Sequence, residues 1–101
     1  MPLRVIRKPQ ALADVIEIYH YIAERSPKGA VTTLRKIDAA VQMLANNPDA
    51  GRSRTELAPR LRSFPAGRFM IFYVHGAAQL DIVRILHTAR DLKPDMFAED
   101  D

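Results

Sequence analysis

Residues 68–87 read RFMIFYVHGAAQLDIVRILH, and this stretch decides the fold. Its first part, residues 68–74, is dense in aromatic and β-branched side chains, which is typical of a central strand. Residues 75–78 form a short connection that contains Gly76, and residues 80–87 are a second strand candidate. Two such runs separated by a few turn residues predict a β-hairpin. The second half of the chain is therefore expected to be sheet.

The first half of the chain carries apolar residues at helical spacing. Two stretches, about 9–25 and 27–46, show that period, and Ser26-Pro27 between them indicates an N-cap followed by proline at the first helical position. The two apolar stripes are Leu12, Val15, Ile16, Tyr19, Ile22 and Ala23, then Ala30, Leu34, Ile37, Val41 and Leu44. Because almost nothing joins the helices, an antiparallel helix hairpin is expected. The opposite face of the first helix, with Asp14 and Glu17, should be solvated.

Two further strand candidates complete the order β-α-α-β-β-β. They are residues 3–7 and Leu57 to Phe64, in which Pro59 indicates an edge or a bulge, and residues 65–67 follow as a turn. Helices with apolar stripes should cover one face of an antiparallel sheet of four strands, which gives a two-layer α+β domain. The residues expected to be mostly buried are Leu12, Ile16, Tyr19, Ile37, Val41, Leu44, Ile71, Tyr73, Ile82 and Leu86.

The 101 residues are expected to form a single domain, 1–101. The tail from about residue 92, which contains Pro94 and ends in Glu99-Asp100-Asp101, is expected to fray. The sequence has no cysteine, which excludes disulfides, thiol nucleophiles and zinc thiolates. No run approaches the ~20 apolar residues of a membrane helix, and the N-terminus lacks the apolar run of a signal peptide. The composition therefore favours a cytoplasmic protein that does not bind membranes.

The positive charge is concentrated in one segment. The net charge is only +3, but five arginines between residues 52 and 68 are opposed by the single carboxylate of Glu56. They are Arg52, Arg54, Arg60, Arg62 and Arg68. Arginine binds phosphates and carboxylates with two parallel hydrogen bonds. The segment is either a solvated charged rim or a surface for a polyanion or an acidic partner.

The ordered set of these features resembles the ParE-like branch of the ParE/RelE superfamily, the plasmid-stabilisation and type II toxin–antitoxin toxins. The similarity runs from about residue 4 to residue 97. It is carried by residues 11–23 of the first helix, Ser26-Pro27, Leu44-Ala45, Pro48 with Gly51-Arg52, Leu61-Arg62-Ser63, Gly67-Arg68, Ile71-Phe72-Tyr73 and residues 82–91, which end R-I-L-H-x-A-R-D. No single piece is specific, whereas the whole ordered set is fairly specific.

The resemblance implies one of two activities. ParE-like members inhibit DNA gyrase by binding, whereas RelE-like members are ribosome-dependent endoribonucleases that cut mRNA. Both kinds are neutralised by a cognate antitoxin, here a ParD-like or similar protein, in a hetero-oligomer. RelE-like nucleases commonly carry an arginine three residues before the tyrosine of the third strand and a tyrosine near the C-terminus. Met70 and Phe97 stand at those places, which weakens the nuclease interpretation.

A nuclease in this chain would depend on His87, Arg68, Arg84 and Arg90. His87 can titrate near neutrality, but it can equally be structural and hydrogen-bond the tail, for example at Asp91. Arg84 stands among apolar neighbours and is therefore expected to pair with a carboxylate or to face an open surface. His20 and His75 are expected to be solvated.

The sequence thus favours a toxin that acts by binding rather than an enzyme. Its expected target-binding residues are Arg68, Arg84 and Arg90, and its expected antitoxin-binding residues are Arg60 and Arg62. The three histidines form no metal-ligand spacing, so neither a metal nor a cofactor is expected. Two alternatives stay open: a RelE-like ribonuclease acting on the ribosome and its mRNA, and a non-toxic module that keeps only antitoxin recognition.

Overall fold

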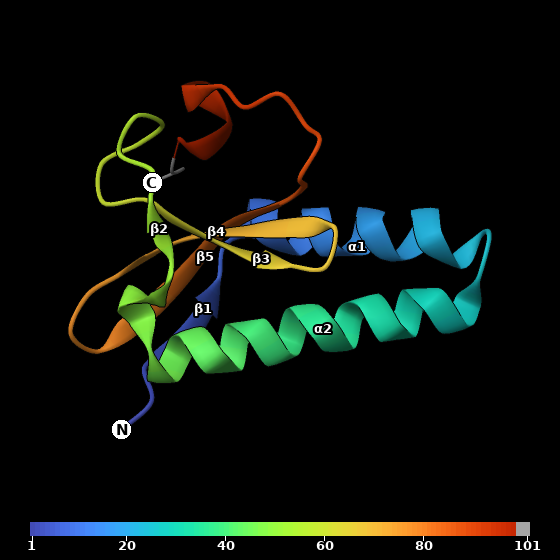
Figure 1. Ribbon diagram of the computed structural model, residues 1–101, viewed down its shortest axis with the longest axis horizontal. Coiled ribbons are helices and arrows are strands. Elements are labelled where there is room, and N and C mark those ends of the chain that lie inside the picture. The colour runs from blue at the N-terminus through green and yellow to red at the C-terminus, as the bar shows by residue number, and fades with distance from the viewer. Residues whose placement is uncertain (99–101) are drawn as a thin grey trace.

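The computed structural model describes residues 1–98, which form two helices packed on one face of a five-stranded sheet (Figure 1). The elements are β1 Arg4–Arg7, α1 Pro9–Ala23, α2 Pro27–Asn46, η1 Pro48–Ala50, β2 Arg52–Ser53, β3 Arg62–Ala66, β4 Phe69–His75, β5 Gln79–His87 and η2 Pro94–Phe97, where η marks a 3-10 turn. The two-layer α+β architecture is the predicted one. No helix in the described part of the chain is long and apolar enough to cross a membrane.

The sheet is mixed, with strand order β1-β5-β4-β3-β2. The pairs from β2 to β5 are antiparallel, but β1 lies parallel to β5, so the expectation of a wholly antiparallel sheet of four strands is wrong at this edge. Short turns force antiparallel pairing on β3, β4 and β5. No turn joins β1 to β5, so its direction is set by where the helix hairpin returns the chain. The extra strand β2 has only two residues, too few for an alternation that could predict it.

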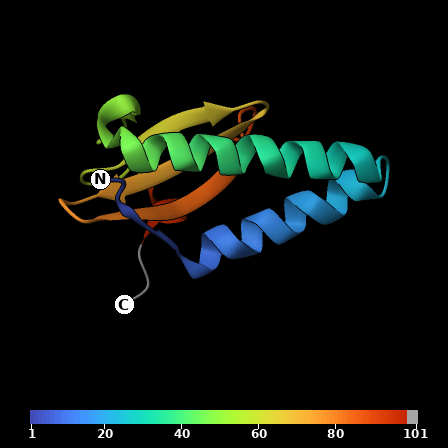
Figure 2. The ribbon, with the colours of Figure 1, turned by 90° about the horizontal axis from the view of Figure 1, so that it is seen from below.

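Serine and proline begin α2 as expected, since the Ser26 hydroxyl accepts the backbone N–H of Gly29 at 3.0 Å. Both helices extend beyond the turn between β3 and β4 (Figure 1). They meet at their hairpin tip and diverge toward the sheet (Figure 2). The helix hairpin therefore overhangs one end of the sheet.

The first core cluster lies between the helices and the sheet. Seven of the predicted core residues are buried. Six of them belong to this cluster, namely Ile37, Val41, Leu44, Ile71, Tyr73 and Ile82, whereas Leu86 belongs to the cluster on the other face. The prediction for α1 is wrong, because Leu12, Ile16 and Tyr19 are 48%, 59% and 37% exposed. The helix instead buries Ala11 and Asp14, a face turned away from the bulkiest side chains. Val15 and Ile18 pack against the core from that face, and the carboxylate of Asp14 binds the edge of β5.

The alternation of side chains between the two faces of β5 is interrupted at Val83. Phe72 pairs with Arg84 while Tyr73 pairs with Ile82, so Val83 is one extra residue in β5. Such a bulge reverses which face the following residues occupy. After the bulge, Ile85 packs under the helices together with Ile82, whereas Leu86 lies with Val83 on the opposite face.

The strand predicted at Leu57 to Phe64 begins later, at Arg62, and runs on through Pro65 to Ala66. The turn after it depends on Gly67, whose φ of 62° is a left-handed conformation that glycine adopts without strain. Residues 54–61 form a loop instead of a strand, and Pro59 is consistent with that because it cannot donate to a ladder.

The second apolar cluster lies on the other face of the sheet. Met70 and Phe72 of β4 are covered there by the loop 54–61 and by the C-terminal tail, and Phe97 is 3% exposed with its ring centroid 4.6 Å from that of Phe72. The expectation that the chain frays from about residue 92 is therefore wrong for residues 92–98. Glu99-Asp100-Asp101 lie outside the described residues.

Candidate functional site

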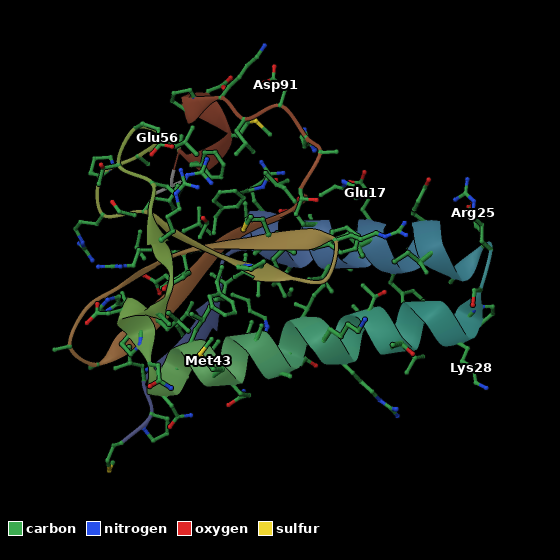
Figure 3. All side chains as sticks on the ribbon, viewed as in Figure 1. Glu17, Arg25, Lys28, Met43, Glu56 and Asp91 are labelled. Carbon is green, nitrogen blue, oxygen red and sulfur yellow. The ribbon has the colours of Figure 1, made fainter. Side chains whose placement is uncertain are left out.

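A groove of about 680 Å³ lies beneath the overhanging helix hairpin. Its walls come from α1, α2, the β3–β4 turn and the end of β5. Ile18 and Phe69 give it an apolar interior, and Glu17 lies on the α1 wall. Figure 3 shows Glu17 projecting from α1 toward the segment that carries Asp91. Arg25 and Lys28, also labelled there, lie at the tip of the hairpin beyond the sheet.

Three cations gather around this groove. The backbone carbonyl of Arg68 accepts the N–H of Thr88 at 2.9 Å, and the N–H of Arg90 donates to the carbonyl of His87 at 3.0 Å. These two bonds hold Arg68, His87 and Arg90 at one end of the sheet. Lys36 reaches them from α2, because its stem lies over Gly67. Within residues 1–98, neither Arg68, Arg90 nor Lys36 is in an ion pair.

His87 is exposed at the rim of the groove. Its Nδ1 accepts the backbone N–H of Ala89 at 3.0 Å, and its ring meets that of Phe69 edge-on at 5.5 Å between centroids. Among the side chains that the structure describes, no carboxylate contacts this ring, so the suggested bond to Asp91 is not formed. The imidazole therefore closes the turn after β5.

Arg84 pairs with a carboxylate, as its apolar neighbours suggested. Its Nε and Nη2 donate to the two oxygens of Asp14, each at 2.8 Å, and its Nη1 donates to the carbonyl of Met96 at 3.0 Å. Asp14 also accepts the N–H of Ile85 at 3.0 Å, at the edge of β5 where β1 has ended. The hydrogen bond with Asp14 raises the pKa of Arg84 above its ordinary value. The expectation that Asp14 is solvated is wrong, because its carboxylate is buried in this ion pair. Together, the hydrogen bonds of Asp14 and Arg84 join α1, β5 and the tail.

Much of the arginine-rich segment is engaged within the protein. Arg62 donates to the carbonyl of Gly51 at 2.8 Å and lies 3.6 Å from the carboxylate of Asp49. Arg54 pairs with Glu56 at 3.0 Å, and this hydrogen bond lowers the pKa of the Glu56 carboxyl. These contacts are local, since they close the chain between α2 and β3. The arginine-rich segment is therefore neither a row of unpaired cations for a polyanion nor a fully solvated rim.

Arg60 and His75 lie beside that region. Arg60 has φ of 62° and donates from Nη2 to the carbonyl of His75 at 3.1 Å. His75 is half-buried, and its Nε2 lies 2.9 Å from the carboxylate of Asp49, so the expectation that His75 is merely solvated is wrong. His20 is exposed, with its ring edge-on to Tyr19.

The sequence also matches a family model described as the ParE toxin of the type II toxin–antitoxin system parDE, over residues 5–92. The chain belongs to the ParE toxin family. It is 34% identical to Toxin ParE1 of Mycobacterium tuberculosis (strain ATCC 25618 / H37Rv), covering 91% of this chain and 96% of the relative. It is also 35% identical to Toxin RelE2 of Caulobacter vibrioides, covering 80% of this chain and 90% of the relative.

Solved structures share the fold of this ParE-family chain at lower identity. A structure titled "Chromosomal ParDE TA system from P. aeruginosa" matches with a TM-score of 0.70 and 23% identity over 84% of this chain and 95% of that chain. The toxin–antitoxin complex RelBE2 from Mycobacterium tuberculosis matches with a TM-score of 0.63 and 21% identity over 86% and 99%. Identities this low show likeness of fold.

Of the residues proposed from the sequence, Arg68, His87 and Arg90 lie together at the groove. Arg84 instead forms the ion pair with Asp14. Sequence reasoning missed the α2 contribution, Lys36, which lies 31 residues before Gly67 in a helix whose orientation no local pattern gives. Sequence reasoning placed Glu17 on a solvated helix face. The polar character of that face was the only sequence feature that could have indicated that it borders a groove.

Sequence reasoning also missed the role of Tyr73 in this ParE-family chain. The hydroxyl donates to the carbonyl of Pro48 at 2.7 Å and accepts the N–H of Gly51 at 2.9 Å. Burial raises the pKa of the Tyr73 phenol. A side chain at Gly51 would overlap the phenol, so glycine is required there. Tyr73 therefore anchors the turn after α2 to the sheet.

Proposed function

We propose that this ParE-family chain is a toxin that inhibits DNA gyrase by binding it, and that a cognate, ParD-like antitoxin neutralises it in a hetero-oligomer. The family match supports the toxin assignment. The face of the sheet away from the helices supports a toxin that acts by binding rather than by cleaving RNA. In a RelE-like nuclease that face would carry a cation at the position of Met70, where phosphate charge is stabilised. Here Met70 and Phe72 belong to an apolar cluster that the tail covers with Phe97.

The groove supplies the proposed target-binding residues. Arg68 and Arg90 are exposed, and Lys36 joins them from α2. Guanidinium groups that form no ion pair within residues 1–98 can bind carboxylates or phosphates of a partner with two hydrogen bonds each. Arg84, whose donors are used by Asp14 and Met96, supports this surface by joining β5 to α1 and to the tail. The antitoxin is proposed to contact Arg60 and Arg62, of which Arg60 is the more exposed.

The test is a supercoiling assay with purified gyrase beside an in-vitro translation assay. The proposal expects loss of supercoiling, relief by the antitoxin and no cutting of mRNA on purified ribosomes. Ribosome-dependent RNA fragments with unaffected gyrase would reject it. A chain inactive in both assays that still binds the antitoxin would be the non-toxic module.

A RelE-type ribonuclease is the second candidate, and two observations favour it. The 35% identity to Toxin RelE2 is as high as that to the ParE proteins. His87 also lies beside Arg68 and Arg90, a base next to two cations, which is what cleavage by a ribose 2′-OH requires. This candidate predicts mRNA fragments that disappear when His87 is changed to glutamine.

A further inference from the structure

An open hollow of about 440 Å³ lies on the face of the sheet away from the helices. It separates the loop 54–61 from the tail, and Figure 1 shows that loop and η2 on the side of the sheet opposite α2. Leu61 of the loop, Val83 of β5 and Phe97 of the tail all line it, and Arg60 is the one polar residue of its lining among residues 1–98. Leu61, Val83 and Phe97 are only 1%, 4% and 3% exposed and form the floor, whereas the exposed residues of the lining, Arg60 among them, form the rim. A hollow of this size can accept one aromatic or aliphatic side chain.

Arg60 stands at the hollow in an unusual backbone conformation. It is the one non-glycine residue with positive φ in the part of the chain that the structure describes. Arginine rarely adopts this conformation, and such outliers persist where the surroundings or a function require them. Within residues 1–98, one of the five N–H donors of its guanidinium is engaged, by the carbonyl of His75. Arg54 and Arg62 differ, because both are in salt bridges.

We propose that this hollow is a docking site for a peptide segment that inserts an aromatic or branched aliphatic side chain and pairs an adjacent acidic side chain with Arg60. The single cation beside an otherwise apolar lining determines this chemistry. A nucleic-acid strand would need a row of cations for its phosphates, and the lining provides one. The site deepens the proposed antitoxin contact at Arg60, but its test uses no antitoxin, so its failure is distinct from failure of the gyrase assay.

The probe is the acetylated tripeptide amide Asp-Phe-Asp, titrated into the isotope-labelled chain and followed by amide chemical shifts. The control probe is Lys-Phe-Lys, which has the same anchor and the opposite charge. The acidic probe should shift the amides of Leu61, Val83 and Phe97 and bind at least about tenfold more tightly than the basic probe, because only the acidic probe offers carboxylates to the Arg60 guanidinium. Equal affinities, or shifts confined to the groove at Arg68, would overturn the proposal.

Two variants separate binding from folding. Arg60→Gly removes the cation and relieves the backbone, since glycine accepts this φ, so the melting temperature should hold or rise while the preference for the acidic probe disappears. Arg52→Ala, at an exposed arginine on β2 outside the hollow, should leave both unchanged. Undiminished binding to Arg60→Gly would reject the site.

A chain ending at Ala98 tests the remaining occupant, the acidic residues 99–101 that follow, because Ala98 also lines the hollow. Unchanged affinity of this shortened chain for the acidic probe supports docking of a partner. An affinity gain of about tenfold or more would assign the hollow to the chain's own acidic end and overturn the proposal.

Discussion

Arg84 shows how one residue can join three elements. Its side chain is 14% exposed and that of Asp14 is 8% exposed, and the pair links α1 to β5 while a third donor holds the tail at Met96. Two charges taken out of water in this way depend on each other, because removing either one leaves the other buried without a partner. A substitution of Arg84 is therefore expected to change nearby surfaces indirectly, by loosening the contacts among α1, β5 and the tail.

A double-mutant cycle tests this dependence. Asp14→Asn keeps an oxygen for the N–H of Ile85 but leaves the charge of Arg84 uncompensated, and we expect a loss of about 3 kcal/mol in the free energy of unfolding. Arg84→Gln should cost a similar amount, and the double variant should cost less than the sum by about 1 kcal/mol or more. Urea unfolding measures all three, and strictly additive losses would show that the pair is not coupled.

The phenol of Tyr73 predicts a dependence of stability on alkaline pH. Burial raises its pKa in the folded state, so the folded protein holds this proton more tightly than the unfolded chain. The stabilisation is present below the unfolded value, about pH 10, and is lost as pH rises through the folded pKa. Urea unfolding between pH 8 and 11 should show a steeper decline for the wild type than for Tyr73→Phe. Parallel declines would assign the alkaline sensitivity to other groups.

At the scale of elements, α1 exposes its bulkiest apolar side chains and buries Ala11 and Asp14. A helix normally turns its largest apolar residues inward. Here Val15 and Ile18 pack against the core instead, on the face that also carries Asp14, whose carboxylate accepts the N–H of Ile85. The exposed stripe contributes little to the core and consists of Leu12, Ile16 and Tyr19.

The two helices should consequently tolerate substitution very differently. Ile16→Ser, on the exposed stripe, should change the free energy of unfolding by no more than about 0.5 kcal/mol. Ile37→Ser, at a site that is 3% exposed, should cost at least about 3 kcal/mol, because it removes packing and buries a hydroxyl. Thermal and urea unfolding of both variants makes the comparison. A large loss at Ile16 would mean that the stripe is covered in solution.

At the scale of the whole molecule, the two faces of the sheet differ in character. The helix side carries the groove with Arg68, Arg90 and Lys36, whereas the other side is an apolar cluster closed by a loop and the tail. A toxin that acts by binding needs the first surface and no reactive group on the second. The proposal therefore makes the groove cations, and not His87, responsible for toxicity.

Growth inhibition by point variants tests that assignment. Arg68→Ala and Arg90→Ala should each reduce toxicity, by roughly tenfold or more in dose if each forms a charge-assisted pair with the target. His87→Gln should leave toxicity largely intact, since the glutamine amide can still accept the N–H of Ala89. Unchanged melting temperature and antitoxin binding are required of every variant. Toxicity that is lost only with His87 would favour the ribonuclease.

The sequence by itself determined the features that depend on neighbours along the chain. Apolar spacing predicted both helices, Ser26-Pro27 predicted the break between them, and the β-branched runs predicted β4 and β5 close to their observed bounds. Turns, caps and periodicity act over a few residues, so their physics is present in any short window. The pairing of Arg84 with a carboxylate was also predictable in kind, because a charge among apolar neighbours needs a partner.

Only the tertiary structure decided which partner Arg84 takes, since Asp14 lies 70 residues away and on the helix face expected to be solvated. The tertiary structure also decided three other features: the parallel direction of β1, the bulge at Val83 and the packing of Phe97 against Phe72. Each depends on the relative placement of elements far apart in sequence. That placement is determined by the free energy of the whole packed core. No single short stretch of the sequence contributes enough of this free energy to decide the placement.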